Sequence, residues 1–300
     1  MAVDTFVNAS SVDEALEALA AGARVVAGGT DLVVLARQGK APLPSSLVAI
    51  HRVEELRGIT TTDAGLRMGA LVTHAELVSH AAVRDRFTAI ADASALVGSH
   101  ATRAHGTVGG NLMNASPAMD TGGPLVCLDA TATLASTGGT RELPVSELFV
   151  GPGKTSAKAE ELLTALHVPE PVAGTGSSYV RLEYRRAMEI AIVGATAVVT
   201  VEGDRVADAR IAITALAPTV HRVPEAEELL AGSDAEPAAA EAAASAAAAA
   251  AAPISDVRAS ADYRRAMATV MTLRAIEAAL TRARGESVPI PASSAPGAGA

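Results

Sequence analysis

The sequence has very few aromatic residues and a single cysteine. Aromatic side chains make up 2% of its 300 residues and tryptophan is absent, so the core must be packed mainly from alanine, valine, leucine and isoleucine. Cys127 alone excludes an internal disulfide, a four-thiolate iron–sulfur cluster and a multi-cysteine zinc site within one chain. Redox chemistry in this chain would therefore require a bound cofactor.

Basic residues and long apolar runs are also scarce. The formal net charge is −9 and no basic run is longer than the pair Arg185-Arg186, which argues against nucleic-acid binding. The alanine-rich stretch 238–252 is too weakly apolar, and too often interrupted by polar residues, to span a bilayer. Residues 1–8 lack the basic segment and apolar run of a signal peptide. We expect a cytoplasmic protein with no transmembrane segment.

A chain of this length exceeds the usual size of one hydrophobic core. Its pattern predicts an α+β protein with two α/β subdomains, at residues 1–56 and 57–176. A C-terminal α+β domain with a small antiparallel sheet and helices is expected at 177–288, followed by a disordered tail at 289–300.

The first segment has the pattern of a β-α-β unit. Ser11 and Glu14 form a capping box that predicts a helix reaching about Ala21. An apolar strand at 24–27 ends at two glycines, and a second strand follows at 46–50.

The second and third segments mix hairpins with helices. In the second we expect a hairpin at 57–70, a capping box at Thr73 and Glu76, a helix at about 84–96, an irregular stretch at 98–124, and strands at 130–136 and 140–143. In the third we expect paired strands at 190–201 and 206–216, an alanine-rich helix or linker, and a helix at 261–284. That helix should be well buried, because Tyr263, Met267, Val270 and Met271 share one face and Leu273, Ile276 and Leu280 an adjoining one.

Two glycine-rich loops are candidate binding sites for a nucleotide pyrophosphate. Without basic residues, such a group needs a concave set of backbone N–H groups, and only glycine lets the main chain approach that closely. One such loop is more often a plain strand-ending turn, but two strengthen the case. The first loop comprises Val25, Val26, Ala27, Gly28, Gly29, Thr30, Asp31 and Leu32, and the second comprises Thr107, Val108, Gly109, Gly110 and Asn111.

Asp120 follows the second loop. A carboxylate beside a phosphate site would repel the ligand unless it accepts hydrogen bonds from sugar or ribityl hydroxyls. The alternative is that Asp120 caps a helix.

Together these motifs resemble the FAD-binding medium subunits (subunit M) of the xanthine dehydrogenase and aerobic carbon monoxide dehydrogenase family, the molybdenum hydroxylases. The resemblance is an ordered series over nearly the whole chain. The series is 27–32 (AGGTDL), Gly98-Ser99 with Arg103, 107–111 (TVGGN), 115–118 (ASPA) with Asp120, 161–163 (ELL) before Pro169, Arg185-Arg186, and 262–265 (DYRR).

The resemblance implies a fold of the vanillyl-alcohol-oxidase (PCMH-like) type, in which the two α/β subdomains hold FAD between them. It places the pyrophosphate on the two glycine loops and the hydroxyls of the FAD chain on Asp120. Val97, Leu163 and Arg181 match positions near the flavin or adenine, although relatives often have lysine at the position of Arg181. Ala101, Thr102 and Ala104 depart from the residues that many relatives carry around Arg103.

The resemblance also implies a function and partners. The chain would pass electrons from partner iron–sulfur clusters through FAD to NAD or another acceptor, with no catalytic acid or base and no metal of its own. An iron–sulfur small subunit and a molybdopterin large subunit would be separate chains, assembled as a dimer of heterotrimers. The first loop favours a purine or another organic substrate over carbon monoxide. The alternative function is a flavin-free interaction or assembly module.

Two other motifs do not support a different function. The run 151–155 resembles a P-loop, but the first glycine that motif requires would fall at Leu148. Ser99, His100 and His105 are close in sequence, yet no nucleophile elbow or acid partner accompanies them. A hydrolase triad is therefore not expected.

Overall fold

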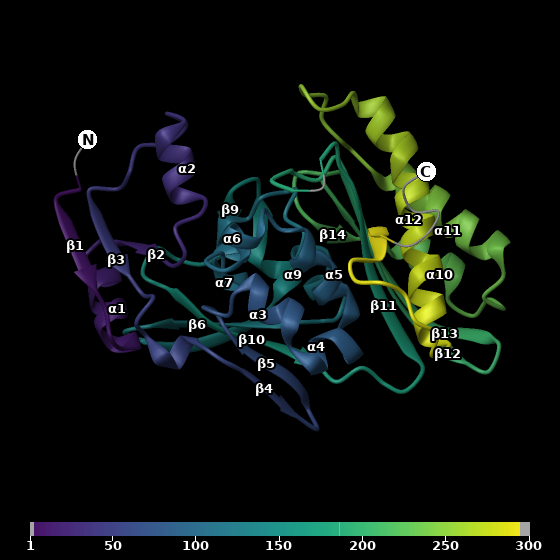
Figure 1. Ribbon diagram of the computed structural model, residues 1–300, viewed down its shortest axis with the longest axis horizontal. Coiled ribbons are helices and arrows are strands. Elements are labelled where there is room, and N and C mark those ends of the chain that lie inside the picture. Colours follow the sequence, from purple (N-terminus) through teal and green to yellow (C-terminus); the bar gives the residue numbers. More distant parts are fainter. Residues whose placement is uncertain (1–2, 186, 295–300) are drawn as a thin grey trace.

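The computed structural model describes residues 3–185 and 187–294. The first sheet is parallel, with strand order β1-β3-β2 (Figure 1). Its strands are β1 (Thr5–Asn8), β2 (Arg24–Val26) and β3 (Ser46–Ala49), and its helices are α1 (Val12–Ala20) and α2 (Leu32–Arg37). The Ser11 side chain accepts the Glu14 N–H at the start of α1, as the capping pattern predicted. Strand β1 was not predicted, because three of its four residues are exposed and give no apolar run.

The second sheet is antiparallel and has the order β4-β5-β10-β6-β7. Its predicted hairpins, 57–70 and 130–143, are confirmed. The strands are β4 (Ile59–Thr62), β5 (Gly65–Gly69), β6 (Thr131–Ser136), β7 (Gly139–Pro144) and β10 (Leu162–Pro169), with the short 3-10 helix η1 (Glu54–Leu56) before β4 and the small hairpin of β8 (Phe149–Gly151) and β9 (Lys154–Thr155) between β7 and β10.

The helices of this part of the chain pack on two sheets. They are α3 (His74–Ser79), α4 (Ala81–Arg86), α5 (Thr88–Leu96), α6 (His100–Arg103), α7 (Val108–Asn114), α8 (Gly122–Cys127) and α9 (Val145–Leu148). Of these, α7 and α9 contact the second sheet, whereas α5 and α8 contact the third. The Thr73–Glu76 capping box is confirmed. The single helix predicted at 84–96 is wrong, because the chain breaks at Phe87, whose fully buried ring occupies the core.

The stretch 98–124 is more regular than predicted. It contains α6 and α7 and the start of α8, each too short to show an apolar period. The Ser99 and Thr107 side chains cap α6 and α7, and Ala115 ends α7 in a left-handed conformation at φ 46°. Capping residues, rather than hydrophobic pattern, set these boundaries.

The third sheet is antiparallel and carries helices on one face (Figure 1, right). Its strands are β11 (Thr175–Leu182), β12 (Val193–Glu202), β13 (Arg205–Thr214) and β14 (His221–Arg222), and its helices are α10 (Pro224–Leu230), α11 (Pro237–Ala250) and α12 (Ala261–Ala283), followed by the 3-10 helix η2 (Ala292–Ser294). The alanine-rich stretch is thus a helix. The predicted pair of long strands and the long C-terminal helix are confirmed.

Small residues let the helices of this domain approach the sheet closely. A Cβ atom at Gly176 would lie 2.1 Å from the carbonyl oxygen of Ala279 on α12. The buried apolar residues of α12 are Ala268, Ala275 and Ala279 together with Met271, Ile276 and Leu280. Tyr263 is 46% exposed, so its predicted burial is wrong. No helix of the described residues is long and apolar enough to cross a membrane.

The predicted disorder from residue 289 onward is wrong for residues 289–294, and residues 295–300 lie outside the described part. The Ala292 N–H donates to Asp92 Oδ1 at 2.9 Å, and the Ser293 hydroxyl accepts the Arg181 N–H at 3.1 Å. These bonds hold the end of the chain against α5 and β11.

A buried ion pair joins the second and third sheets. Arg282 near the end of α12 donates to both oxygens of Asp92 on α5, at 2.6 and 3.0 Å. The two side chains are 7% and 0% exposed. The Tyr179 N–H donates to the same carboxylate, so Asp92 connects α5, β11, α12 and the chain end.

We predict that Arg282→Ala lowers the free energy of unfolding by about 3 kcal/mol or more, because it leaves the buried Asp92 carboxylate without its counter-charge. Urea unfolding measures this. The control is Arg86→Ala, which removes the more exposed pair with Glu170 and should cost about 1 kcal/mol or less. Equal effects of the two substitutions would contradict the prediction.

Candidate functional site

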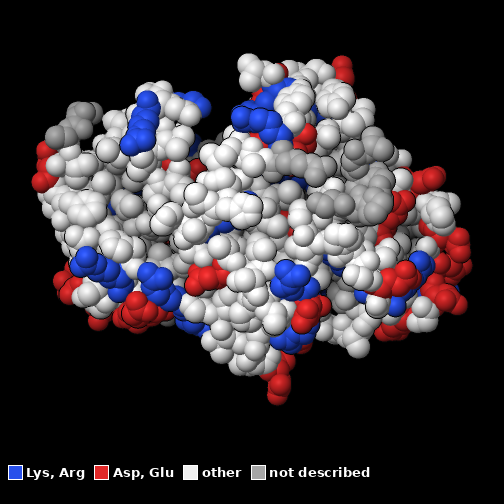
Figure 2. Space-filling view, viewed as in Figure 1, with Lys and Arg blue, Asp and Glu red and all other residues white. Residues whose placement is uncertain are grey.

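The two glycine-containing segments meet at a backbone contact. A Cβ atom at Gly28 would lie 1.9 Å from the carbonyl oxygen of His105. A Cβ atom at Gly106 would lie 3.6 Å from the Thr30 hydroxyl. Gly28 is therefore required by the packing of the two segments, whether or not a ligand is bound. In Figure 2 the upper edge of the molecule is notched beside α2, the helix that follows the first loop.

The first loop presents a row of free backbone donors. The N–H groups of residues 28–32 donate to no acceptor among the described residues. Val33 is the first residue whose N–H returns to the loop, donating to the Gly29 carbonyl at 3.0 Å. Gly29 has a φ of +69°, a conformation that glycine adopts without strain. Consecutive free N–H groups in such a turn form an anion-binding concavity.

The second loop does not repeat this arrangement, and that part of the prediction is wrong. Val108 and Gly109 donate their N–H groups to Val72 and Ala70, at 2.9 and 3.0 Å. The Gly110 and Asn111 N–H groups donate to the Thr107 side chain and carbonyl. The start of α7 is thus satisfied within the protein.

Gly110 still leaves room for a ligand. A Cβ atom there would have only the Thr107 hydroxyl, at 3.0 Å, within 4 Å. By contrast, a Cβ at Gly109 would lie 2.6 Å from the Ala70 carbonyl. Gly109 is needed for packing, whereas the open side of Gly110 is a place that a side chain would fill.

Asp120 lies in a buried polar network. Its carboxylate accepts the Tyr179 hydroxyl at 2.7 Å and Arg181 Nη1 at 2.9 Å. Burial and the adjacent carboxylate raise the pKa of Tyr179, so the phenol remains protonated and donates. The capping alternative for Asp120 is wrong, because α8 begins after Thr121 and no side chain caps it.

Arg181 is fully buried rather than a solvated surface charge. Its side chain is 0% exposed and also pairs with Glu183. Two carboxylates therefore neutralise it. Tyr179 and Glu183 were not predicted as members of this network. The alternation of side chains along a strand does not show which residues of other elements they contact.

The remaining predicted residues differ in their surroundings. Leu163 on β10 is buried in the core of the second sheet, next to a bulge. The Val97 carbonyl accepts Arg103 Nη1 at 2.8 Å. His74, which was not predicted, is buried near Gly106, whose carbonyl accepts its backbone N–H at 3.0 Å. Burial and Arg103 lower the pKa of His74 to about 4, so its imidazole is neutral at neutral pH.

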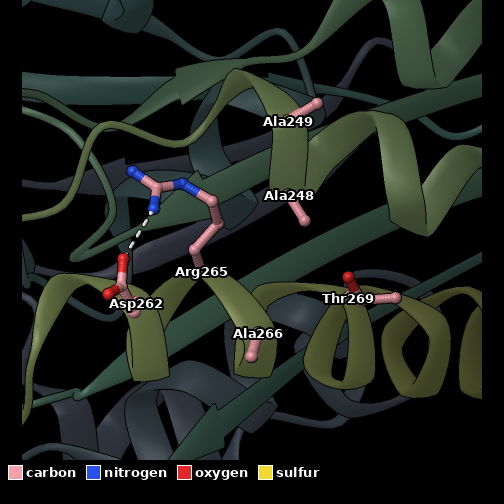
Figure 3. Close-up of a pocket in the computed structure, with 6 residues that line it drawn as sticks. All are labelled: Ala248, Ala249, Asp262, Arg265, Ala266 and Thr269. Atoms are coloured by element: carbon pink, nitrogen blue, oxygen red, sulfur yellow. Dashed lines mark hydrogen bonds and ion pairs between the residues drawn. The ribbon is translucent and has the colours of Figure 1, made fainter.

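Other features give no catalytic centre. A hollow of about 420 Å³ between α11 and α12 is lined by Ala248, Ala249, Asp262, Arg265, Ala266 and Thr269 (Figure 3). Its charged groups are already paired, Arg265 with Asp262 at 3.3 Å. Burial raises the pKa of the Cys127 thiol, which makes it a poor nucleophile. The described residues contain no cluster of side chains that could hold a metal ion.

Comparison with known proteins identifies the family. A model described as the FAD binding domain in molybdopterin dehydrogenase matches residues 2–171, and one described as the CO dehydrogenase flavoprotein C-terminal domain matches residues 178–279. The chain belongs to the family of FAD-binding subunits of molybdenum hydroxylases. It is thus a component of an oxidoreductase.

Relatives of this flavoprotein family match along most of their length. The carbon monoxide dehydrogenase medium chain of Hydrogenophaga pseudoflava is 33% identical over 91% of this chain and 95% of its own. The 6-hydroxypseudooxynicotine dehydrogenase complex subunit alpha of Paenarthrobacter nicotinovorans is 35% identical over 93% and 95%. A solved carbon monoxide dehydrogenase from H. pseudoflava, which lacks the Mo-pyranopterin moiety, superposes with a TM-score of 0.89 at 33% identity, covering 93% of this chain and 97% of that chain.

The Asp120 network predicts a stability effect in the FAD-free flavoprotein. Asp120→Asn should lower the free energy of unfolding by about 3 kcal/mol, because buried Arg181 loses one of its two counter-charges. Tyr179→Phe should cost about 1 kcal/mol, because the carboxylate keeps its arginine. Urea unfolding compares them, and an Asp120→Asn chain as stable as the wild type would exclude the network as a source of stability.

Proposed function

We propose that this chain holds FAD with its diphosphate on the free N–H groups of residues 28–32. The observation that carries the proposal is this row of five unpaired donors, which suits a diphosphate without a neighbouring lysine. A Cβ atom at Gly110 would have only the Thr107 hydroxyl within 4 Å, so the other surroundings of Gly110 leave room for a ligand. The residues present therefore fit the cofactor.

The predicted site residues take different roles in this proposal. Val25, Val26 and Ala27 lead β2 into the loop, Thr30 and Asp31 continue it, and Leu32 begins α2. Thr107 and Asn111 hold the second segment, where the Asn111 side chain accepts the Thr121 hydroxyl at 2.7 Å. Asp120 would accept ligand hydroxyls with the lone pairs that Tyr179 and Arg181 leave free. Val97, Leu163 and Arg181 would help to form the wall of the site.

FAD, when bound, exchanges single electrons with iron–sulfur clusters and electron pairs with an acceptor such as NAD. The residues of this chain bind and orient it, and none is required to move a proton. The iron–sulfur and molybdopterin centres would lie on separate small and large subunits, in a dimer of heterotrimers in the cytoplasm. The medium-chain and complex-subunit names of the relatives support such an assembly. A purine or another organic compound remains the substrate class that we propose.

The FAD proposal is tested by titrating FAD into the FAD-free chain and recording the flavin absorption bands. We expect saturable binding of one FAD. Gly110→Ala should weaken it by about tenfold, because the added methyl group narrows the ligand's approach and affinity falls tenfold for each 1.4 kcal/mol lost.

Gly138→Ala is the matched control, since Gly138 lies in the β6–β7 turn, and a Cβ there would contact only the Ser136 hydroxyl, at 3.7 Å. It should leave FAD affinity unchanged. A folded wild-type chain that binds no FAD would support the flavin-free assembly module instead.

A further inference from the structure

Arg103 is partly buried and, unlike seven other partly or fully buried arginines, has no counter-charge among the described residues. No carboxylate of the described residues lies within ion-pair distance of it, and its described hydrogen bond is the one to the Val97 carbonyl. The arginines that do pair with carboxylates are Arg141, Arg181, Arg210, Arg222, Arg258, Arg264 and Arg282. Charged groups that are withdrawn from water are normally paired with an opposite charge, and the described residues supply none to Arg103.

Two ionisable neighbours interact with Arg103. Burial and the neighbouring Arg181 both lower the pKa of Arg103. Arg103 in turn contributes to the lowered pKa of His74. His74 is neutral at neutral pH, and Arg181 is already paired with Asp120 and Glu183, so neither offers a free charge to a ligand. Arg103 therefore offers a positive charge that no carboxylate of the described residues pairs, in a chain whose net charge is −9.

The position of Arg103 connects it to the proposed cofactor site. It ends α6, and two residues later the His105 carbonyl packs against Gly28 of the first loop. Burial and the charge of Arg181, which belongs to the Asp120 network, both lower the pKa of Arg103. Arg103 is thus two residues from the contact that fixes the first loop, and its charge interacts with that of the buried network.

We propose that the Arg103 guanidinium binds the diphosphate of the dinucleotide, an inference that rests on the proposed function. Its bond to Val97 orients the group and leaves its other N–H donors for phosphate oxygens. A planar guanidinium can contact two oxygens of a phosphate at once. Arg103 therefore supplies the charge, and residues 28–32 supply the neutral donors.

The test uses the FAD-free full-length chain and three ligands: FAD, ADP, which keeps the diphosphate without the flavin, and riboflavin, which lacks the phosphates. Arg103→Gln should weaken both FAD and ADP by about tenfold or more, and leave riboflavin unchanged. Arg103→Lys should weaken FAD and ADP several-fold, because it keeps the charge and loses the planar fork.

Arg84→Gln is the matched control. Arg84 is exposed on α4 and donates to the Val78 carbonyl at 3.3 Å, so its loss removes the same charge and a similar bond. It should leave all three affinities at the wild-type value. Melting temperatures confirm that each variant is folded.

Wild-type affinity for ADP in folded Arg103→Gln would overturn the inference, and so would a loss of FAD affinity without a loss for ADP. If Arg103→Gln does not fold, Arg103→Lys decides, and wild-type ADP affinity in that variant would overturn it as well. A wild-type chain that binds neither FAD nor ADP would instead overturn the proposed function.

Discussion

The approach of Gly28 to the His105 carbonyl is the contact on which the arrangement of the site depends. It joins the first sheet to the segment between α6 and α7, with no space for a Cβ atom. Because the loop is fixed there, its following N–H groups are held in one orientation without hydrogen bonds of their own. A preorganised donor set loses little conformational freedom on binding, which favours affinity.

Whether a cation of this site is free to bind a ligand depends on whether a carboxylate already pairs with it. Arg181, the cation that sequence resemblance placed near the flavin, is neutralised by Asp120 and Glu183. Among the described residues Arg103 has no such partner, and this is why we propose it as the cation that binds the diphosphate. Whether a carboxylate lies beside a cation can be seen only from three-dimensional contacts.

Much of the fold could be predicted from local patterns, and the partners within the site could not. The glycine pair at 28–29 and the capping boxes are read from adjacent residues, so their turns and helix starts were predictable. The second loop looked equivalent to the first, yet its N–H groups donate to Val72 and Ala70, residues that no spacing rule connects to it. Likewise, the hydrogen bond from Tyr179 to Asp120 joins positions 59 residues apart.

The pairing of Asp92 with Arg282 has a consequence for synthesis of the chain. The two residues are 190 positions apart, and chains emerge from the ribosome with the N-terminal part first, at about 5 to 20 residues per second. The first two sheets are therefore available to fold before the guanidinium exists, with the Asp92 carboxylate facing an uncovered α5. The nascent subunit completes this interior only when α12 has been translated, so the packing of α5 waits for a helix that is synthesised about 190 residues later.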